Sequence, residues 1–309
     1  MNLRYTEGVE AVVRTGSMTA ASKELCITQS GLSQMIKRAE RDLGAEIFNR
    51  STEPITLTQA GQRYLEAMRQ VSAINTGLIN EVAQIKGQTR GRLRLGISIQ
   101  RGMQLLPLIM PEFARRYPNV RIELTEQGSA SLERLLHEGL FDIGLITTEP
   151  HFTDLVYELL ETEEVVLIAA KDSRLAQRLK GRQGLSIGET AQEPFVTLRS
   201  GHSVRKVQDT LFAKHMITPP VLIETDSLEA AKRLAATGAG LMLCPNVYID
   251  QDRELRDRVV RLRVKDMAYK RSFYACWRQN MPLTRFMRDL IEISKHMLGD
   301  GTPDIVSGK

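Results

Sequence analysis

The sequence of 309 residues contains no long apolar run. Its longest, Val165–Ala170, is six residues, whereas a helix that crosses a bilayer needs about 20 apolar residues. Glu7 and Glu10 interrupt the N-terminal segment, so the apolar core of a signal peptide is absent there. We therefore expect a cytoplasmic protein that does not have a membrane as a partner.

Cysteine is also scarce, and the common catalytic patterns are missing. Cys26, Cys244 and Cys276 lie far apart and form no CxxC pair, which argues against a zinc site or a disulfide framework. A redox role for one of these thiols stays open. The five histidines lack metal-ligand spacing, and the chain has no HExxH, GxSxG, P-loop or GxGxxG pattern. We expect no catalytic residues, no metal, no cofactor and no enzyme activity.

The segment from Ser17 to Arg50 has the pattern of a short helix, a tight turn and a second helix, followed by the start of a hairpin. Thr28 is placed to cap the second helix, predicted over 29–43, and Gly44 to end it. Leu25 and Ile27 are expected to anchor the turn in the core. Apolar residues then recur on one face of the second helix, at Leu32, Met35, Ile36, Ala39 and Leu43.

The opposite face of that helix carries hydrogen-bonding and basic side chains. Glutamine pairs with adenine edges, serine adapts to several partners, and Lys or Arg contacts guanine or phosphate, so the helix suits the major groove of double-stranded DNA. A plain helical hairpin with a solvated polar face is the alternative. We expect base contacts from Gln29, Ser30, Ser33, Gln34 and Lys37, and phosphate contacts, or minor-groove contacts from the wing, from Thr28, Arg38 and Arg50.

The net charge of +5 does not arise in this segment. Residues 1–58 hold seven Lys or Arg and seven Asp or Glu, so DNA contact there depends on local placement of the basic side chains. An architectural protein that binds DNA without sequence choice would need a strongly basic domain. The balance of charge argues against that function.

Residues 1–61 carry a set of residues in a fixed order without gaps: Met1–Arg4, Gly16-Ser17, Thr19, Ala21, Leu25, Gln29, Leu32-Ser33, Ile36, Glu40, Leu43-Gly44, Phe48, Arg50 and Leu57–Gly61. In these residues the segment resembles the winged helix–turn–helix of the LysR-type transcriptional regulators. Ser22, Ser30 and Ala39 depart from the family pattern, and these departures affect stability more than base reading. The resemblance implies a regulator that binds promoter DNA and responds to a small-molecule effector.

A long helix is predicted over 59–87, ended by Gly87, with a heptad seam along it. Such a seam pairs helices along their length, so we expect dimerisation, although the seam could instead pack on the chain's own next domain. The resemblance implies antiparallel pairing with a second subunit, a homodimer and a homotetramer. The seam residues are Tyr64, Met68, Val71, Asn75, Leu78, Val82 and Ile85.

Beyond residue 90 the pattern alternates strands and helices, which predicts a mainly parallel sheet with helices on both faces. Strands are predicted over 93–97, 120–125, 142–147, 164–170, 195–198, 221–225, 241–244 and 271–277. Stretches such as Gly91–Gly96, Phe113–Pro118, Gly139–Ile146 and Gly238–Pro245 resemble the LysR effector domain. The expected fold is an N-terminal all-α winged helix–turn–helix with a long linker helix, followed by an α/β two-lobed domain like the periplasmic binding proteins. The expected parts are 1–58, the linker 59–89, the effector domain 90–301 (lobe I 90–162 and 268–301, lobe II 163–267) and a flexible tail 302–309.

Ligands of open α/β sheets lie beyond the carboxyl ends of strands, where helix N-termini present free amides. We expect a small anionic effector, such as a carboxylate, between the two lobes. Ordinary loop and cap roles are the alternative, for Ser129 and Ser227 above all. The expected lining is Ser98, Gln100, Arg101, Gln127, Gly128, Thr147, Thr197, Arg199, His202 and Thr225.

The sequence thus predicts a DNA-binding transcriptional regulator controlled by an effector. A regulator that works without a ligand is the alternative, because the fold can persist without a working pocket. RNA polymerase is a further expected partner, and effector identity, target genes and the direction of regulation stay open.

Overall fold

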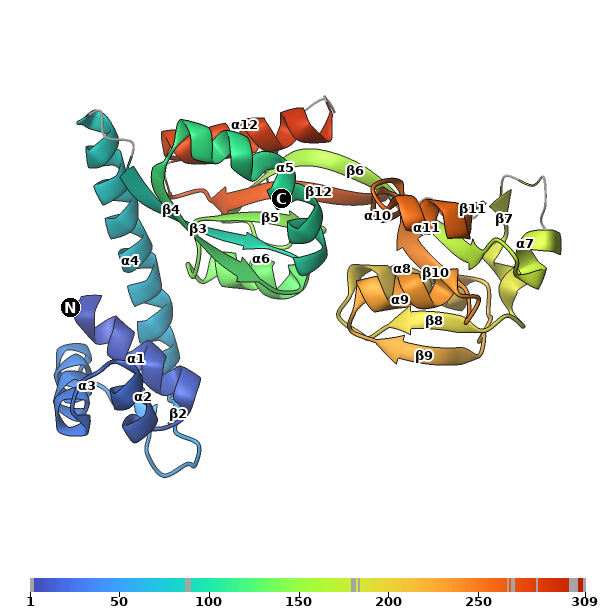
Figure 1. The fold of residues 1–309 in the computed structure, drawn as a ribbon. Helices are drawn as coiled ribbons and strands as arrows, with labels where there is room; N and C mark the ends of the chain where they lie inside the picture. Colours follow the sequence, from blue (N-terminus) through green and yellow to red (C-terminus); the bar gives the residue numbers. More distant parts are fainter. Residues whose placement is uncertain are drawn as a thin grey trace.

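The computed structural model describes residues 3–86, 90–178, 182, 184–265, 267, 270–281, 283–299 and 305–307. An N-terminal helical domain leads through the long helix α4 (Gln59–Ile85) to two α/β lobes. Lobe I lies between α4 and lobe II (Figure 1). Within the described ranges, every helix is too short or too polar to cross a membrane.

The N-terminal domain is a helical core with a small hairpin. It consists of α1 (Leu3–Thr15), α2 (Met18–Glu24), α3 (Gln29–Leu43) and the antiparallel pair β1 (Phe48–Asn49) and β2 (Thr56–Leu57). The Thr28 hydroxyl accepts a hydrogen bond from the Gly31 amide, and Gly44 ends α3 with a φ of 74°, so both predicted caps are confirmed. Ile27 is 38% exposed, so the expectation that it anchors the core is wrong.

Helix α4 begins inside this domain. Tyr64 and Met68 are buried in the N-terminal core, not offered to a second chain, so their assignment to a dimer seam is corrected. Further along, the buried Asn80 docks α4 on lobe I, because its amide donates to the Arg92 carbonyl and its oxygen accepts from the Arg92 amide. The predicted helix end at Gly87 lies outside the described residues.

Lobe I contains β3 (Arg90–Ile97), α5 (Ile99–Arg116), β4 (Asn119–Glu126), α6 (Ser129–His137), β5 (Ile143–Thr147), β12 (Lys270–Arg278) and α12 (Arg285–Leu298). Strands β4, β3 and β5 are parallel, whereas β12 pairs antiparallel with β5. Strand β6 (Leu155–Ala170) pairs antiparallel with β12. The sheet is therefore mixed, not mainly parallel as expected. Helices α5 and α12 cover one face of the sheet and α6 the other (Figure 1).

Strand β6 continues into lobe II, where β10 (Met242–Pro245) and β11 (Val259–Val264) pair with it, and the two-residue β7 (Gly184–Leu185) joins β11. Strands β8 (Phe195–Leu198) and β9 (Val221–Thr225) form a separate parallel pair. Around these strands lie α7 (Arg174–Arg178), η1 (Ile187–Thr190), α8 (Ser203–Lys214), α9 (Leu228–Ala236), α10 (Val247–Asp250) and α11 (Arg253–Arg258).

Two parts of this region differ from the sequence expectation. Strand β6 begins at Leu155, whereas only 164–170 was predicted, and β11 was not predicted. In the expected flexible tail, β13 (Ile305–Ser307) pairs antiparallel with β6. The remaining tail residues, 302–304 and 308–309, lie outside the described part of the chain.

Candidate DNA-binding surface and effector cleft

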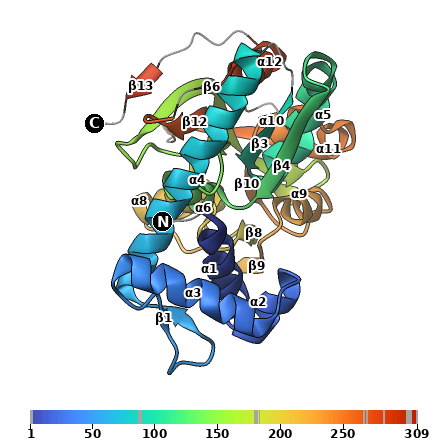
Figure 2. The same ribbon diagram turned by 90° about the vertical axis from the view of Figure 1, so that its left-hand side faces the viewer.

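The polar face of α3 is turned to solvent. Leu32, Ile36 and Ala39 bury its other face against α1 and α2. Figures 1 and 2 both show α3 on the side of the N-terminal domain that faces away from the lobes. Among the predicted DNA-contacting residues, Ser33 is half-buried and the others are exposed: Thr28, Gln29, Ser30, Gln34, Lys37, Arg38 and Arg50.

Three of these side chains are already engaged within the chain. The Thr28 hydroxyl caps α3 and lies 3.2 Å from the Ser30 hydroxyl. Arg50 Nη2 donates to Glu40 Oε2 at 2.8 Å, and the other Glu40 oxygen accepts from the Ile47 amide at 3.1 Å. Glu40 therefore fixes the start of the wing against α3. Sequence reasoning gave it no role, although it belongs to the set that matches the LysR family.

The outer face of α4 is apolar and exposed over its second half. Val71, Leu78, Val82 and Ile85 from the predicted seam lie on it, together with the exposed Asn75. Ile74 and Ile79 widen this face and were not in the predicted seam. We call the apolar residues the α4 outer strip: Val71, Ile74, Leu78, Ile79, Val82 and Ile85, between 40% and 79% exposed.

A cavity of about 480 Å³ lies between the lobes. The starts of three helices meet there, at Ser98 (α5), Gly128 (α6) and His202 (α8), and none of these N-cap positions makes a side-chain capping bond. The predicted Gln100 and Gln127 also line it. A neighbouring hollow of about 300 Å³ shares His202 and includes Thr147, whose buried hydroxyl has no hydrogen-bond partner among the described residues.

Arg101, Thr197, Arg199 and Thr225 were predicted to line the cleft but line neither hollow. Arg101 is 1% exposed and pairs with Glu161 at 2.6 Å and with Glu163, and its guanidinium lies 4.2 Å from the Phe273 ring centroid. It faces the crossing strands because two carboxylates there neutralise it. Thr197 is buried. The Thr225 hydroxyl accepts from the Ser227 amide.

Arg199 is 61% exposed and pairs with Asp226 on the rim of the cavity. The arginine that lines the cavity is Arg271, at the start of β12, rather than Arg101 or Arg199. Its Nη1 donates to Glu163 at 2.7 Å and its Nη2 to the Ser203 hydroxyl at 3.0 Å. Its buried Nε has no partner among the described atoms. No local signal in the sequence distinguished Arg271 from the other arginines. Ser227 caps α9, as the alternative foresaw, whereas Ser129 lines both hollows.

Two of the three thiols are inaccessible. Burial raises the pKa of the Cys244 thiol to about 12, and burial likewise raises the pKa of Cys276 well above its ordinary value. Both stay protonated at neutral pH, where the thiolate is the reactive form. Cys26, in the turn before α3, is exposed.

Comparison with known proteins assigns both parts of the chain. Residues 3–62 match the family model of the bacterial regulatory helix-turn-helix protein, lysR family, and residues 86–299 match the LysR substrate binding domain. The transcriptional regulator ShiR of Corynebacterium glutamicum is 30% identical over 246 residues, which cover 79% of this chain and 82% of ShiR.

Two solved structures share the whole architecture. Full-length OxyR from Pseudomonas aeruginosa has a TM-score of 0.72 at 21% identity and covers 96% of this chain and 94% of its own. Full-length CbnR in complex with its target DNA has a TM-score of 0.62 at 20% identity, covering 96% and 100%. These likenesses show the fold, and the two family matches together span most of the sequence. The chain belongs to the LysR family of transcriptional regulators.

Proposed function

We propose that this protein regulates transcription by inserting α3 into the major groove of promoter DNA. The carrying observation is the contrast between the two faces of α3. One face buries Leu32, Ile36 and Ala39 in the domain core, while Gln29, Gln34 and Lys37 are exposed on the other. Glutamine amides recognise adenine edges, and lysine recognises guanine or phosphate. Such a regulator acts in the cytoplasm and needs no catalytic group.

A gel shift on the region upstream of the chain's own gene tests this step. Gln34→Ala should lose preference at one base pair, a penalty of about 1–3 kcal/mol for the cognate duplex over a base-substituted one. Gln62→Ala, an exposed glutamine on α4 outside the predicted DNA face, serves as the matched control. Equal discrimination by Gln34→Ala and wild type would contradict base reading by α3.

The α4 outer strip supports a homodimer. The helix has 27 residues, about 40 Å at the ordinary helical rise, and its second half presents large apolar side chains to solvent. Helices with such strips bury them against one another. Two α3 helices related by a dyad would read half-sites about one helical turn apart. We further propose that these dimers assemble into tetramers and that the protein contacts RNA polymerase.

The cleft between the lobes supports a small anionic effector. Three uncapped helix starts point amides and positive dipole ends at one cavity, and Arg271 adds an unpartnered Nε. A thermal-shift screen of the full chain against small carboxylic acids tests the effector class. An acid that stabilises the wild type should stabilise Arg271→Gln less, and equal stabilisation of both would place the acid elsewhere. A regulator that works without ligand predicts no stabilising acid.

A further inference from the structure

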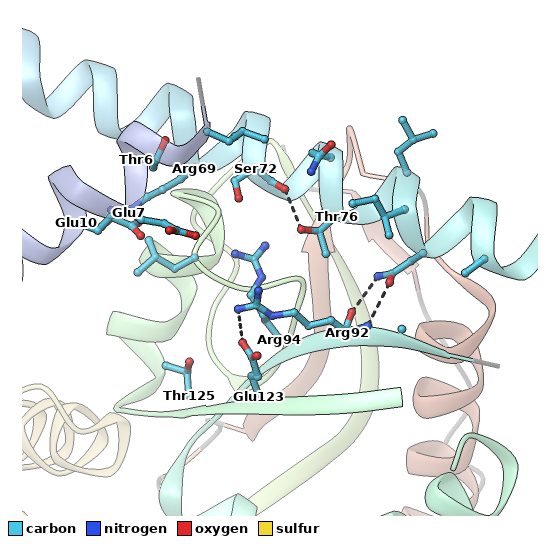
Figure 3. A pocket seen from close by; sticks show the side chains of 18 of the residues that line it. Thr6, Glu7, Glu10, Arg69, Ser72, Thr76, Arg92, Arg94, Glu123 and Thr125 are labelled. Atoms are coloured by element: carbon cyan, nitrogen blue, oxygen red, sulfur yellow. Dashed lines mark hydrogen bonds and ion pairs between the residues drawn. The ribbon is translucent and has the colours of Figure 1, made fainter. Parts of the chain in front are cut away.

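Helix α6 and helix α4 meet at Arg69. Its Nε donates to Glu10 of α1 at 2.9 Å, and its Nη1 donates to Glu138, the residue that ends α6, at 3.3 Å. The Arg69 side chain is 17% exposed. It lies in a groove of about 1210 Å³ between α1, α4, β3 and β4, where Figure 3 shows it reaching from α4 towards Glu10. One guanidinium therefore joins the DNA-binding domain, the linker and lobe I.

The backbone of α6 is also held against α4 at this point. Gly139 has a φ of +84°, and a Cβ built on it would lie 3.4 Å from the carbonyl carbon and oxygen of Arg69. At the same turn, Arg278 donates from Nη1 to the Leu136 carbonyl at 2.9 Å. The C-terminal end of α6 cannot move without moving its contacts with α4.

The other end of α6 lies at the effector cleft, where Gly128 and Ser129 line the cavity. The helix is nine residues long, about 13 Å, so a single rigid element spans from the cleft to Arg69. Its N-terminal amides are among those proposed to bind the effector. An anion drawn to them acts directly on α6.

The middle of α6 is tied to lobe II by a short chain of contacts. The buried Glu133 accepts from the Tyr157 hydroxyl at 2.6 Å, from the Thr148 hydroxyl at 2.9 Å and from the His151 amide at 3.1 Å. Between Thr148 and His151 lies Glu149, which pairs with Lys206 of α8 at 3.1 Å. Movement of lobe II relative to lobe I therefore also reaches α6.

We propose that α6 transmits the state of the effector cleft to the DNA-binding domain, and that Arg69 is the positioning residue that receives it. This inference rests on the proposed function. Because a short helix moves as a rigid body, a displacement of α6 at Ser129 or Glu133 also displaces Glu138. Arg69 contacts both Glu138 and Glu10, so the displacement changes the position of α1. Coupling between two sites is reciprocal. Binding of DNA to the N-terminal domain must therefore change the conformation or the dynamics of α6. This change can be measured without knowing the effector.

Hydrogen–deuterium exchange of the full chain, with and without a duplex that the wild type binds in a gel shift, tests the coupling. Peptides covering 129–138 should change their uptake when DNA binds. In Glu138→Gln, which removes the charge that holds Arg69 but leaves Glu10 in place, that change should fall to less than about half. Arg69→Lys, whose single ammonium replaces the two separate guanidinium contacts, should fall between wild type and Glu138→Gln.

Glu112→Gln is the matched control, because it also removes a half-buried carboxylate paired with arginines, Arg115 and Arg116, in the same lobe but on α5. It should keep the wild-type response. DNA binding that leaves uptake over 129–138 unchanged, or an unchanged response in Glu138→Gln, overturns the coupling while the proposed function stands. Failure of the wild type to bind any duplex defeats the proposed function and the coupling with it.

Discussion

Replacing Glu163 by glutamine unbalances the charge cluster at the crossing of β6 and β12. Glu163 is 1% exposed and accepts from Arg101 and, at 2.7 Å, from Arg271. With Glu161, which pairs with Arg101, the cluster holds two positive and two negative charges. Glu163→Gln leaves one positive charge in excess. Breaking a buried ion pair from one side costs about 3–5 kcal/mol, so we expect a loss of that size in the free energy of unfolding.

Urea unfolding followed by fluorescence measures this loss. Trp277 on β12 is the chain's single tryptophan, and it packs against the lobe I core that contains the crossing strands. With a urea dependence of about 3 kcal/mol per molar, the midpoint seen by Trp277 should fall by about 1–1.7 M. Glu112→Gln, which removes the half-buried carboxylate on α5 that pairs with two exposed arginines, should change the midpoint much less.

The double variant Glu163→Gln/Arg271→Gln separates charge from packing. It leaves Arg101 with Glu161, so the cluster is neutral again, and the midpoint should recover part of the loss seen in the single variant. If Glu163→Gln had the same urea midpoint as Glu112→Gln, the electrostatic reasoning would be refuted. A double variant that is less stable than Glu163→Gln would refute it as well.

Further predictions concern the thiols, the DNA contact and the dimer. In native protein an alkylating reagent at pH 8 should label the exposed Cys26 and leave Cys244 and Cys276 unlabelled, because burial raises the pKa of Cys244 to about 12 and that of Cys276 well above normal. Arg38→Ala should reduce the slope of log affinity against log salt by about 0.9, and an unchanged slope would remove Arg38 from the phosphate contacts. Leu78→Asp, in the α4 outer strip, should convert dimers to monomers in sedimentation, whereas an unaltered mass would place the interface elsewhere.

The N-terminal domain was predictable because its determinants are local. Thr28 and Gly44 cap the two ends of α3, within a few residues of its apolar stripe. Leu32, Ile36 and Ala39 in that stripe are buried, as the helical period requires. The linker helix was predictable as a helix but not in its contacts. A heptad pattern cannot say which turns are covered by the chain itself, and the N-terminal core buries Tyr64 and Met68. Which α3 residues touch bases stays a prediction.

The first half of β6 was missed for a different reason. Residues 155–163 contain three glutamates, a residue type depleted in strands, so no strand was predicted there. That omission led to the error at Arg101. The chain-order argument placed Arg101 at a strand end facing a ligand, but Glu161 and Glu163 come from this unpredicted segment and hold its guanidinium at the strand crossing.

The correction at Arg101 also changes what the cleft can recognise. The four charges at the strand crossing sum to zero, because Glu161 and Glu163 offset Arg101 and Arg271. Attraction of an anion must then come mainly from oriented dipoles, the helix starts at Ser98, Gly128 and His202, together with the free Nε of Arg271. Dipole fields fall off within the first turn, so they act on a group seated in the cavity and not on one passing at a distance. We therefore expect effector affinity to depend on the position of the acid group within the ligand and only weakly on ionic strength, since partly buried interactions are screened little. An effector whose affinity falls steeply with salt would place its charge on the exposed rim, beside Arg199, instead of at the helix starts.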